Sequence, residues 1–155
     1  GQSVWFAPAS EGTVEAYHLQ PGAELFLQSG AYLASTSGVM LDSKWQGAKG
    51  FFSGGLFLLR AYGHGTVWFS SYGGLHAVDI GQQYYGYVCD NSHMVAFTQG
   101  LQYNVRKLGG LKSLFLSGEG LICEFSGQGR LWMQTRNPAS LAAFLHPFRP
   151  VGSGG

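Results

Sequence analysis

Short runs of apolar residues alternate along the chain with turns that contain glycine, and the glycines recur roughly every 8–12 residues. This spacing is typical of many short strands joined by tight turns. We therefore predict an all-β fold, an antiparallel β-sandwich. Its predicted strands are Val4–Ala7, Thr13–His18, Glu24–Gln28, Tyr32–Ser35, Leu56–Ala61, Thr66–Ser70, Leu75–Ile80, Tyr84–Cys89, Val95–Thr98, Tyr103–Lys107, Gly120–Phe125 and Arg130–Gln134.

A helical pattern occurs only near the end of the chain, in NPASLAAFL. Asn137 is suited to the N-cap and Pro138 to the first helical position. Leu141, Phe144 and Leu145 then lie on one side of the helix. Because a helix this short is not stable alone in water, we expect these three side chains to pack on this subunit's sheet or on a neighbour's.

An internal repeat links two parts of the chain. Ser53–Ser71 aligns without gaps on Ser117–Thr135, and Trp68 then falls on Trp132. Upstream, LFLQSGAYLAS aligns on YVCDNSHMVAF. We therefore predict two repeated β-units within one domain, because two similar sheets that face each other bury both apolar faces. The predicted ranges are 18–71 and 80–135 for the units, 1–147 for the domain and 148–155 for a flexible tail.

Two Gly-x-Gly turns, GHG and GQG, occupy equivalent places in the repeat. Their glycines are Gly63, Gly65, Gly127 and Gly129. Since hairpin turns need positive φ, we predict that the second turn joins Leu121–Phe125 to Arg130–Gln134 as a hairpin. A dinucleotide fingerprint needs Gly-x-Gly-x-x-Gly between a strand and a helix, so we do not expect phosphate binding here.

Charged residues make up only 11% of the sequence, against about 25% in an average soluble domain. We expect part of the surface to consist of small polar residues and a larger part to be buried against other subunits. The net charge of +1 gives no electrostatic reason to expect nucleic acid or an anionic membrane as a partner. The basic residues Arg106, Lys107 and Lys112 are accordingly interpreted as a solvated loop. The apolar runs have the length of strands, so we predict no transmembrane segment.

The two cysteines, Cys89 and Cys123, show no metal-binding spacing and could pair once. Cys123 alternates with Leu121 and Phe125, which indicates that it points into the core. We favour a buried free thiol at each position, and the redox compartment stays open.

The sequence predicts no catalytic residue, no metal site and no cofactor. No two histidines have the spacing of a metal pair; they are His18, His64, His76, His93 and His146. Glu119 and Glu124 would point to opposite faces of a strand, so they cannot form an acid–base pair. Glu124 and Arg130 flank the predicted hairpin, and we expect an ion pair between them. No serine lies in a Gly-x-Ser-x-Gly motif.

Aromatic residues supply the candidates for a subunit interface. Tyr85 and Tyr87 are predicted on one face of a strand and Tyr84 on the other. Trp68 and Trp132, at equivalent positions of the repeat, are expected in the core or in an interface. Aromatic side chains between subunits would fit the low charge content.

Three long motifs carry a family resemblance: GLKSLFLSGEGLICEFSGQGRLWMQTRNPASLAAFL, SGAYLASTSGVMLDSKWQG and GLFLLRAYGHGTVWFSSYG. From about Val4 to about Leu145 the chain resembles the altered-inheritance-of-mitochondria family. The resemblance implies a fold like that of the tryptophan RNA-binding attenuation protein (TRAP-like, of the double-stranded β-helix type), which tends to assemble. It carries over neither tryptophan nor RNA binding, because a shared fold is not a shared function. The family offers no established catalytic residues, and peripheral membrane association stays open because eukaryotic relatives are linked to mitochondrial inner-membrane organisation.

Two departures from the family pattern matter. Family members usually carry a further β-unit before the point where this chain begins, and Gly1 is not a natural start, so we expect a processed, cut or partial chain. The first repeat reads SGGLFLL and lacks a counterpart of Glu119, which argues against catalysis by that residue.

Together these features predict a non-enzymatic protein that assembles with itself into an oligomer or filament and acts as a structural or scaffolding subunit. The alternative is an oligomeric binding module for a small ligand, a peptide or a nucleic acid. An enzyme would need converging polar groups that the sequence does not show. A bacterial cytoplasmic or a membrane-associated location is favoured.

Overall fold

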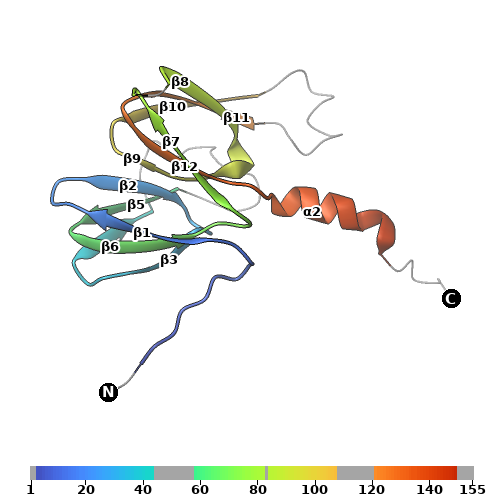
Figure 1. Cartoon of the computed structure of the whole chain (residues 1–155), viewed down its shortest axis with the longest axis horizontal. Helices are drawn as coiled ribbons and strands as arrows, with labels where there is room; N and C mark the ends of the chain where they lie inside the picture. The colour runs from blue at the N-terminus through green and yellow to red at the C-terminus, as the bar shows by residue number, and fades with distance from the viewer. Residues whose placement is uncertain (1–2, 44–57, 83, 108–120, 150–155) are drawn as a thin grey trace.

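The computed structural model describes residues 3–43, 58–82, 84–107 and 121–149, and these ranges form strands with one short helix near the C-terminus (Figure 1). All the paired strands run antiparallel, which confirms the predicted all-β class. The strands are β1 (Val14–Leu19), β2 (Glu24–Gln28), β3 (Tyr32–Ser35), β4 (Val39–Asp42), β5 (Leu58–Gly63), β6 (Gly65–Ser70), β7 (Leu75–Ile80), β8 (Gly86–Asp90), β9 (Met94–Thr98), β10 (Leu101–Lys107), β11 (Leu121–Gly127) and β12 (Gly129–Gln134). The helix is α2 (Pro138–Leu145), and the 3-10 turns are η2 (Asn91–His93) and η3 (His146–Phe148).

The strands form three sheets. A six-stranded sheet has the order β4-β5-β2-β9-β12-β7, and two three-stranded sheets have the orders β1-β6-β3 and β10-β11-β8. In Figure 1 the β10-β11-β8 sheet lies above the six-stranded sheet and the β1-β6-β3 sheet lies below it. The six-stranded sheet therefore has apolar side chains on both faces, and each face packs on a different small sheet.

Phe97 lies at the centre of the core between the six-stranded sheet and the β10-β11-β8 sheet. Its ring stacks on Phe26 with a centroid distance of 5.0 Å. It also makes edge-type contacts with Tyr103 at 5.3 Å and with Phe125 at 5.4 Å. Four aromatic rings from four strands thus fix the distance between the two layers.

Trp132 lies at the centre of the core on the opposite face of the six-stranded sheet. It is 4% exposed and meets Tyr17 and Phe69 edge to face, each at 5.6 Å. Trp68, its counterpart in the alignment, is only half-buried. The prediction of core or interface is thus resolved as core for Trp132 and stays open for Trp68.

The hairpin predicted at the second Gly-x-Gly turn is wrong. β11 pairs with β10 and β8, whereas β12 pairs with β7 and β9, so the chain changes sheets at Gly127-Gln128-Gly129. In the first half β5 pairs with β2 and β4, and β6 pairs with β1 and β3. A hairpin and a corner between sheets both place glycines between two strand-like runs, so the local sequence does not distinguish them.

Left-handed backbone is nevertheless present at three of the four turn glycines. Gly63, Gly65 and Gly127 have φ angles of 105°, 133° and 97°. A Cβ added to Gly127 would lie 2.4 Å from the Gly100 carbonyl oxygen, and one added to Gly63 would lie 2.4 Å from that of Gly38. The corners therefore need glycine both for conformation and for space.

We expect Gly127→Ala to lower the free energy of unfolding by about 3 kcal/mol, since strained φ and a backbone collision act together. Gly22→Ala is the matched control because Gly22 has φ 82° and nothing within 4 Å of an added Cβ. Its expected cost is about 1 kcal/mol, the conformational part alone. Urea unfolding of the two variants measures both values. Equal costs would contradict the role assigned to the corner.

Some strand predictions differ from the structure. The predicted strand Val4–Ala7 is irregular and exposed, and the strand β4 was not predicted. The strand predicted to begin at Tyr84 begins at Gly86, so the expected alternation of tyrosines is wrong. Tyr85 is fully exposed, while the Tyr84 ring contacts the Tyr87 ring at 6.0 Å and Tyr87 packs against the core. Alternation of faces needs extended pairing, which this segment lacks before β8.

Candidate functional site

Helix α2 projects away from the sheets (Figure 1), and none of its residues is buried. Its sequence, PASLAAFL, has Ser140 as its single polar side chain. Phe144 is 68% exposed, and Leu141 and Leu145 are exposed as well. We expected these side chains to pack on this subunit's sheet or on a neighbour's. Among the described residues they are not buried against this subunit's sheet, and packing on a neighbour stays a prediction.

The start of α2 is held firmly to the domain. Asn137 caps the helix as predicted, and its Oδ1 accepts a hydrogen bond from the Ala139 amide at 2.8 Å. The Asn137 Nδ2 donates to Ser92 Oγ at 2.6 Å, and Ser92 Oγ donates to Asp90 Oδ1. Gln134 Nε2 donates to the Ser92 carbonyl at 3.0 Å. Asn137 and Gln134 are buried, so this polar cluster fixes the direction in which the helix leaves the body.

The cap at Asn137 was predicted from the sequence, whereas the rest of this cluster was not. The spacing Asp90-x-Ser92 is a local signal, since an aspartate often accepts from the amide two residues on. The long-range partners Gln134 and Asn137 carry no such signal. They meet Ser92 only because β12 pairs with β9, next to η2.

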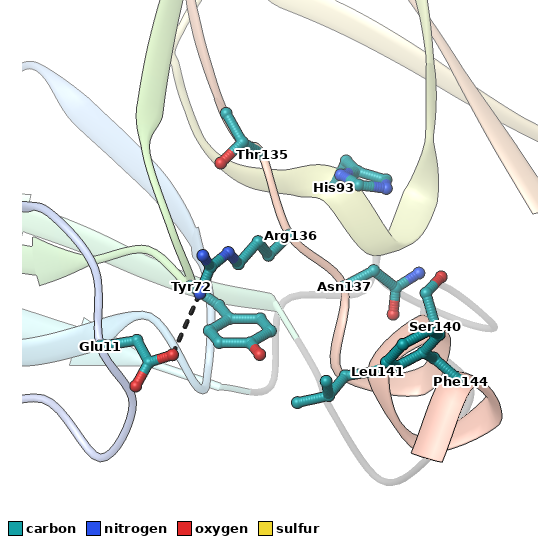
Figure 2. Close-up of a pocket in the computed structure, with 9 residues that line it drawn as sticks. All are labelled: Glu11, Tyr72, His93, Thr135, Arg136, Asn137, Ser140, Leu141 and Phe144. Atoms are coloured by element: carbon teal, nitrogen blue, oxygen red, sulfur yellow. Dashed lines mark hydrogen bonds and ion pairs between the residues drawn. The ribbon is translucent and has the colours of Figure 1, made fainter. Parts of the chain in front are cut away.

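A pocket of about 590 Å³ lies between the base of α2 and the domain (Figure 2). Leu141 and Phe144 supply its apolar wall from the helix. Its other wall carries Tyr72, His93 and Arg136. The volume lies within the range of about 300–1,000 Å³ that is usual for small-molecule sites.

The charges in this pocket are paired and solvated. Arg136 Nη1 lies 3.0 Å from Glu11 Oε1, and the guanidinium lies 5.8 Å from the centre of the Tyr72 ring. Both charged side chains are more than half exposed, so the ion pair contributes little to stability.

His93 is oriented by the backbone. Its Nδ1 lies 2.8 Å from the Gln134 carbonyl oxygen, which can only accept, so Nδ1 carries the proton and donates it. In the neutral ring, Nε2 is then an acceptor. In the described part of the chain, no group of three or more His, Cys, Asp or Glu side chains is placed to hold a metal ion. The described lining of the pocket can thus make apolar contacts and hydrogen bonds.

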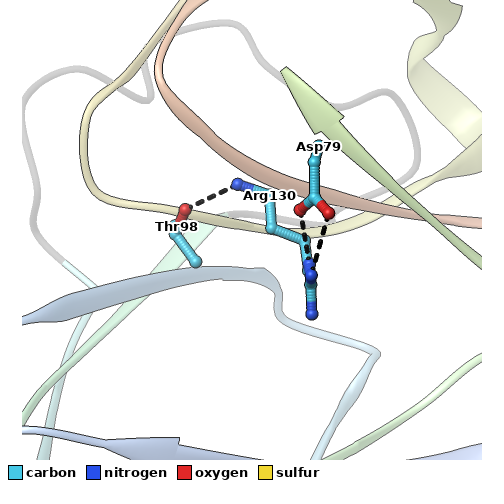
Figure 3. Close-up of polar contacts among 3 residues, drawn as sticks. All are labelled: Asp79, Thr98 and Arg130. Carbon is cyan, nitrogen blue, oxygen red and sulfur yellow. Dashed lines mark hydrogen bonds and ion pairs between the residues drawn. The ribbon is translucent and has the colours of Figure 1, made fainter. Parts of the chain in front are cut away.

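The ion pair predicted between Glu124 and Arg130 is wrong. Arg130 forms a two-point pair with Asp79, its partner on β7, through Nε–Oδ1 and Nη2–Oδ2 distances of 2.7 and 2.9 Å (Figure 3). The Arg130 hydrogen bond holds the pKa of Asp79 below its usual value. Glu124 instead accepts from Arg106 Nε on β10. Since β11 and β12 belong to different sheets, Glu124 and Arg130 are not cross-strand neighbours.

The solvated loop predicted for Arg106, Lys107 and Lys112 is wrong for the first two, which belong to strand β10. Arg106 is paired with Glu124 on the sheet surface. Lys112 and Glu119 lie outside the described residues, as do residues 150–155 of the predicted tail. His64 is exposed at its turn.

Both cysteines are free and buried, as predicted. Cys123 points into the core, and its thiol donates to Asn91 Oδ1 at 3.2 Å. Burial raises the pKa of the Cys89 thiol to about 12. Burial, with the neighbouring Cys89 as a second cause, also raises the pKa of Cys123 to about 12.

The family model described as Mitochondrial biogenesis AIM24 matches residues 1–136. The chain belongs to this family. The match confirms the resemblance carried by the glycine- and aromatic-rich motifs, and it ends just before the residue that caps α2. In the described part of the chain, no helix has the length and apolar character needed to cross a membrane.

An uncharacterized protein of Streptococcus pyogenes serotype M6 is 30% identical to this AIM24-family chain over 153 residues. The alignment covers 95% of this chain and 59% of that protein. A crystal structure of a Streptococcus pyogenes protein has 26% identity and a TM-score of 0.77, with 92% of this chain and 63% of that chain covered. The chain thus spans about three fifths of the length of these relatives.

Proposed function

We propose that this AIM24-family protein is a non-enzymatic β-protein that associates with copies of itself and serves as a structural or scaffolding subunit. The observation that carries the proposal is the apolar helix α2, which has no buried residue in the described chain. A helix that is apolar on all sides is normally buried, and eight residues are too few for a helix to be stable alone. A second copy of the chain can supply the missing cover.

A second apolar surface supports the same proposal. Trp5 is 92% exposed, and its neighbours Val4 and Phe6 are also exposed. Large aromatic side chains are characteristic of interface centres, whereas charged residues are depleted there. The low charge content of the whole chain agrees with an extended contact surface.

Light scattering behind a sizing column tests the proposal directly. We expect wild-type protein to have a mass that is a multiple of 16.7 kDa, with larger particles at higher concentration. Phe144→Ser combined with Leu145→Ser should weaken association by about tenfold or more, since it removes apolar contacts of α2.

Val88→Ser is the matched control because Val88 is an exposed apolar residue on the edge strand β8. It should leave the mass distribution unchanged. A wild-type monomer at all concentrations would overturn the proposed function. An unchanged assembly of the Phe144/Leu145 variant would show that association does not use α2.

We also infer that the domain arose by duplication of one β-unit, as the sequence repeat predicts, and that its fold is TRAP-like. Two pairs of sheet segments support the duplication. When six is added to each strand number, the order β1-β6-β3 becomes β7-β12-β9, which is one half of the six-stranded sheet. In the same way, the other half, β4-β5-β2, becomes the small sheet β10-β11-β8. The close approaches of Gly63 to Gly38 and of Gly127 to Gly100 are equivalent in the same sense.

The second candidate function is a binding module, and the pocket beside α2 favours it. Its aromatic and apolar walls with one arginine suit a small apolar molecule that carries an acidic group. The anionic dye ANS is a suitable probe. Arg136→Ala should weaken dye binding, and Glu11→Gln should strengthen it because Arg136 loses its competing carboxylate. Equal dye binding by both variants and wild type would eliminate this pocket as an anion-binding site.

A further inference from the structure

Cys89 and Cys123 face each other across two neighbouring strands. In the antiparallel register of β8 with β11, each is the direct partner of the other. Direct partners have Cα atoms about 4.5–5.5 Å apart and side chains on the same face. A disulfide requires a Cα separation of about 4.4–6.8 Å. The backbone therefore holds the Cα atoms of the two cysteines at a separation that a disulfide can span.

We propose that Cys89 and Cys123 form a redox site, at which a low-molecular-weight disulfide such as oxidised glutathione converts the two thiols to a cross-strand disulfide. In the first step, the thiolate of one cysteine attacks the oxidant and displaces one glutathione thiolate, which takes up a proton. In the second step, the other cysteine attacks the mixed disulfide, forms the internal S–S bond and displaces the second glutathione. Two protein thiols are oxidised, and one glutathione disulfide is reduced to two thiols.

Burial sets the order of the two steps. Cys89 lies on β8, which among the described strands pairs only with β11 and is an edge of its sheet. It is 8% exposed, whereas Cys123 on the central strand β11 is 0% exposed. The oxidant therefore reaches Cys89 first, and Cys123 resolves the mixed disulfide from inside the core.

Access depends on local opening of the edge strand. In the part of the chain that the structure describes, release of β8 requires the loss of a single ladder, and short edge strands open more readily than central ones. With both thiols protonated and covered in the closed state, the reaction is slow until β8 separates from β11. The rate of oxidation thus reports opening of this strand.

Oxidation changes the neighbourhood of the polar cluster that holds α2. The Cys123 thiol loses the hydrogen that it donates to Asn91. Asn91 belongs to η2, and the next residue, Ser92, accepts the hydrogen bond from Asn137 at the start of the helix. The proposed disulfide therefore fixes β8 to β11 immediately beside the anchor of α2.

The experiment incubates the folded protein with oxidised glutathione, quenches free thiols by alkylation, and maps peptides without reduction. We expect wild-type protein to yield a linked peptide pair that contains Cys89 and Cys123, faster as mild urea is added. Cys123→Ala should stop at a mixed disulfide on Cys89. Cys89→Ala should react far more slowly, since the remaining thiol is fully buried.

Circular dichroism of the two variants controls for loss of the fold. The peptide map of the wild-type protein alone decides whether Cys89 and Cys123 form a disulfide. Stable glutathione adducts on the two cysteines without a linked peptide would overturn the proposal, and so would free thiols throughout a urea series in which β8 amides exchange. Mixed disulfide on Cys123 in preference to Cys89 would contradict the assigned order.

Discussion

Replacement of Trp132 by alanine is expected to lower the free energy of unfolding by about 3–5 kcal/mol, which is a large part of the stability of a domain of this size. The indole is almost completely buried and contacts rings from two strands of the neighbouring sheet, Tyr17 and Phe69. Its removal leaves a cavity between the two layers that the paired strands cannot close. Urea unfolding followed by circular dichroism measures the loss.

Trp68→Ala is the matched control, because Trp68 aligns with Trp132 in the predicted repeat and lies on β6. Its side chain is half-buried on a three-stranded sheet whose inner face is formed by Val67 and Phe69. The expected cost is about 1–2 kcal/mol from partial burial alone. Equal losses for the two tryptophans would contradict the assignment of Trp132 to a core between two sheets.

This pair of tryptophans illustrates what the sequence can and cannot predict. Short apolar runs bounded by glycine-containing turns predicted most of the strands, because both signals are local. Leu131, Trp132 and Met133 are all buried, however, since β12 lies in the middle sheet and has a core on each side. That continuous apolar run is the local sign of a strand covered on both faces.

The sheet topology could not be predicted from the sequences of the turns alone. A hairpin was expected where the chain changes sheets at Gly127, and the ion pair expected for Arg130 was wrong for the same reason. The helix start at Asn137 was predicted correctly because an N-cap is a local pattern. The contacts of Asn137 with Ser92 depend on strand pairing, so this part of the candidate site was not predicted.

Alkaline pH is expected to destabilise the protein strongly, beginning near pH 9. Folding raises the pKa of Cys89 and Cys123 from 9.0 to about 12, chiefly by burial. Above pH 9 the unfolded chain loses these protons while the folded chain keeps them, so the unfolded state binds fewer protons and the free energy of unfolding falls as pH rises. Each thiol contributes a decrease of roughly 1 kcal/mol per pH unit up to about pH 12.

Tyr103 adds to this loss at higher pH. Burial, followed by the nearby Cys123, raises its pKa from 10.0 to about 12, so its contribution begins only above pH 10. Urea unfolding between pH 7 and 11, with reductant present, distinguishes the contribution of the two cysteines from that of Tyr103. In Cys89→Ala combined with Cys123→Ala, the decline between about pH 9 and 10 should largely disappear, while the decline above pH 10 persists.

Wild type and the double variant are compared by the slope of the free energy of unfolding against pH, because removal of two buried thiols also lowers the stability of the variant at every pH. Parallel pH curves for wild type and the double variant would mean that the thiols ionise equally easily in the folded and unfolded chains. The strand β8 would then be open to water at equilibrium, and the slow, opening-dependent oxidation proposed for the cysteine pair would be wrong as well. A steeper wild-type curve supports both a closed edge strand and a redox site that becomes reactive only when that strand opens.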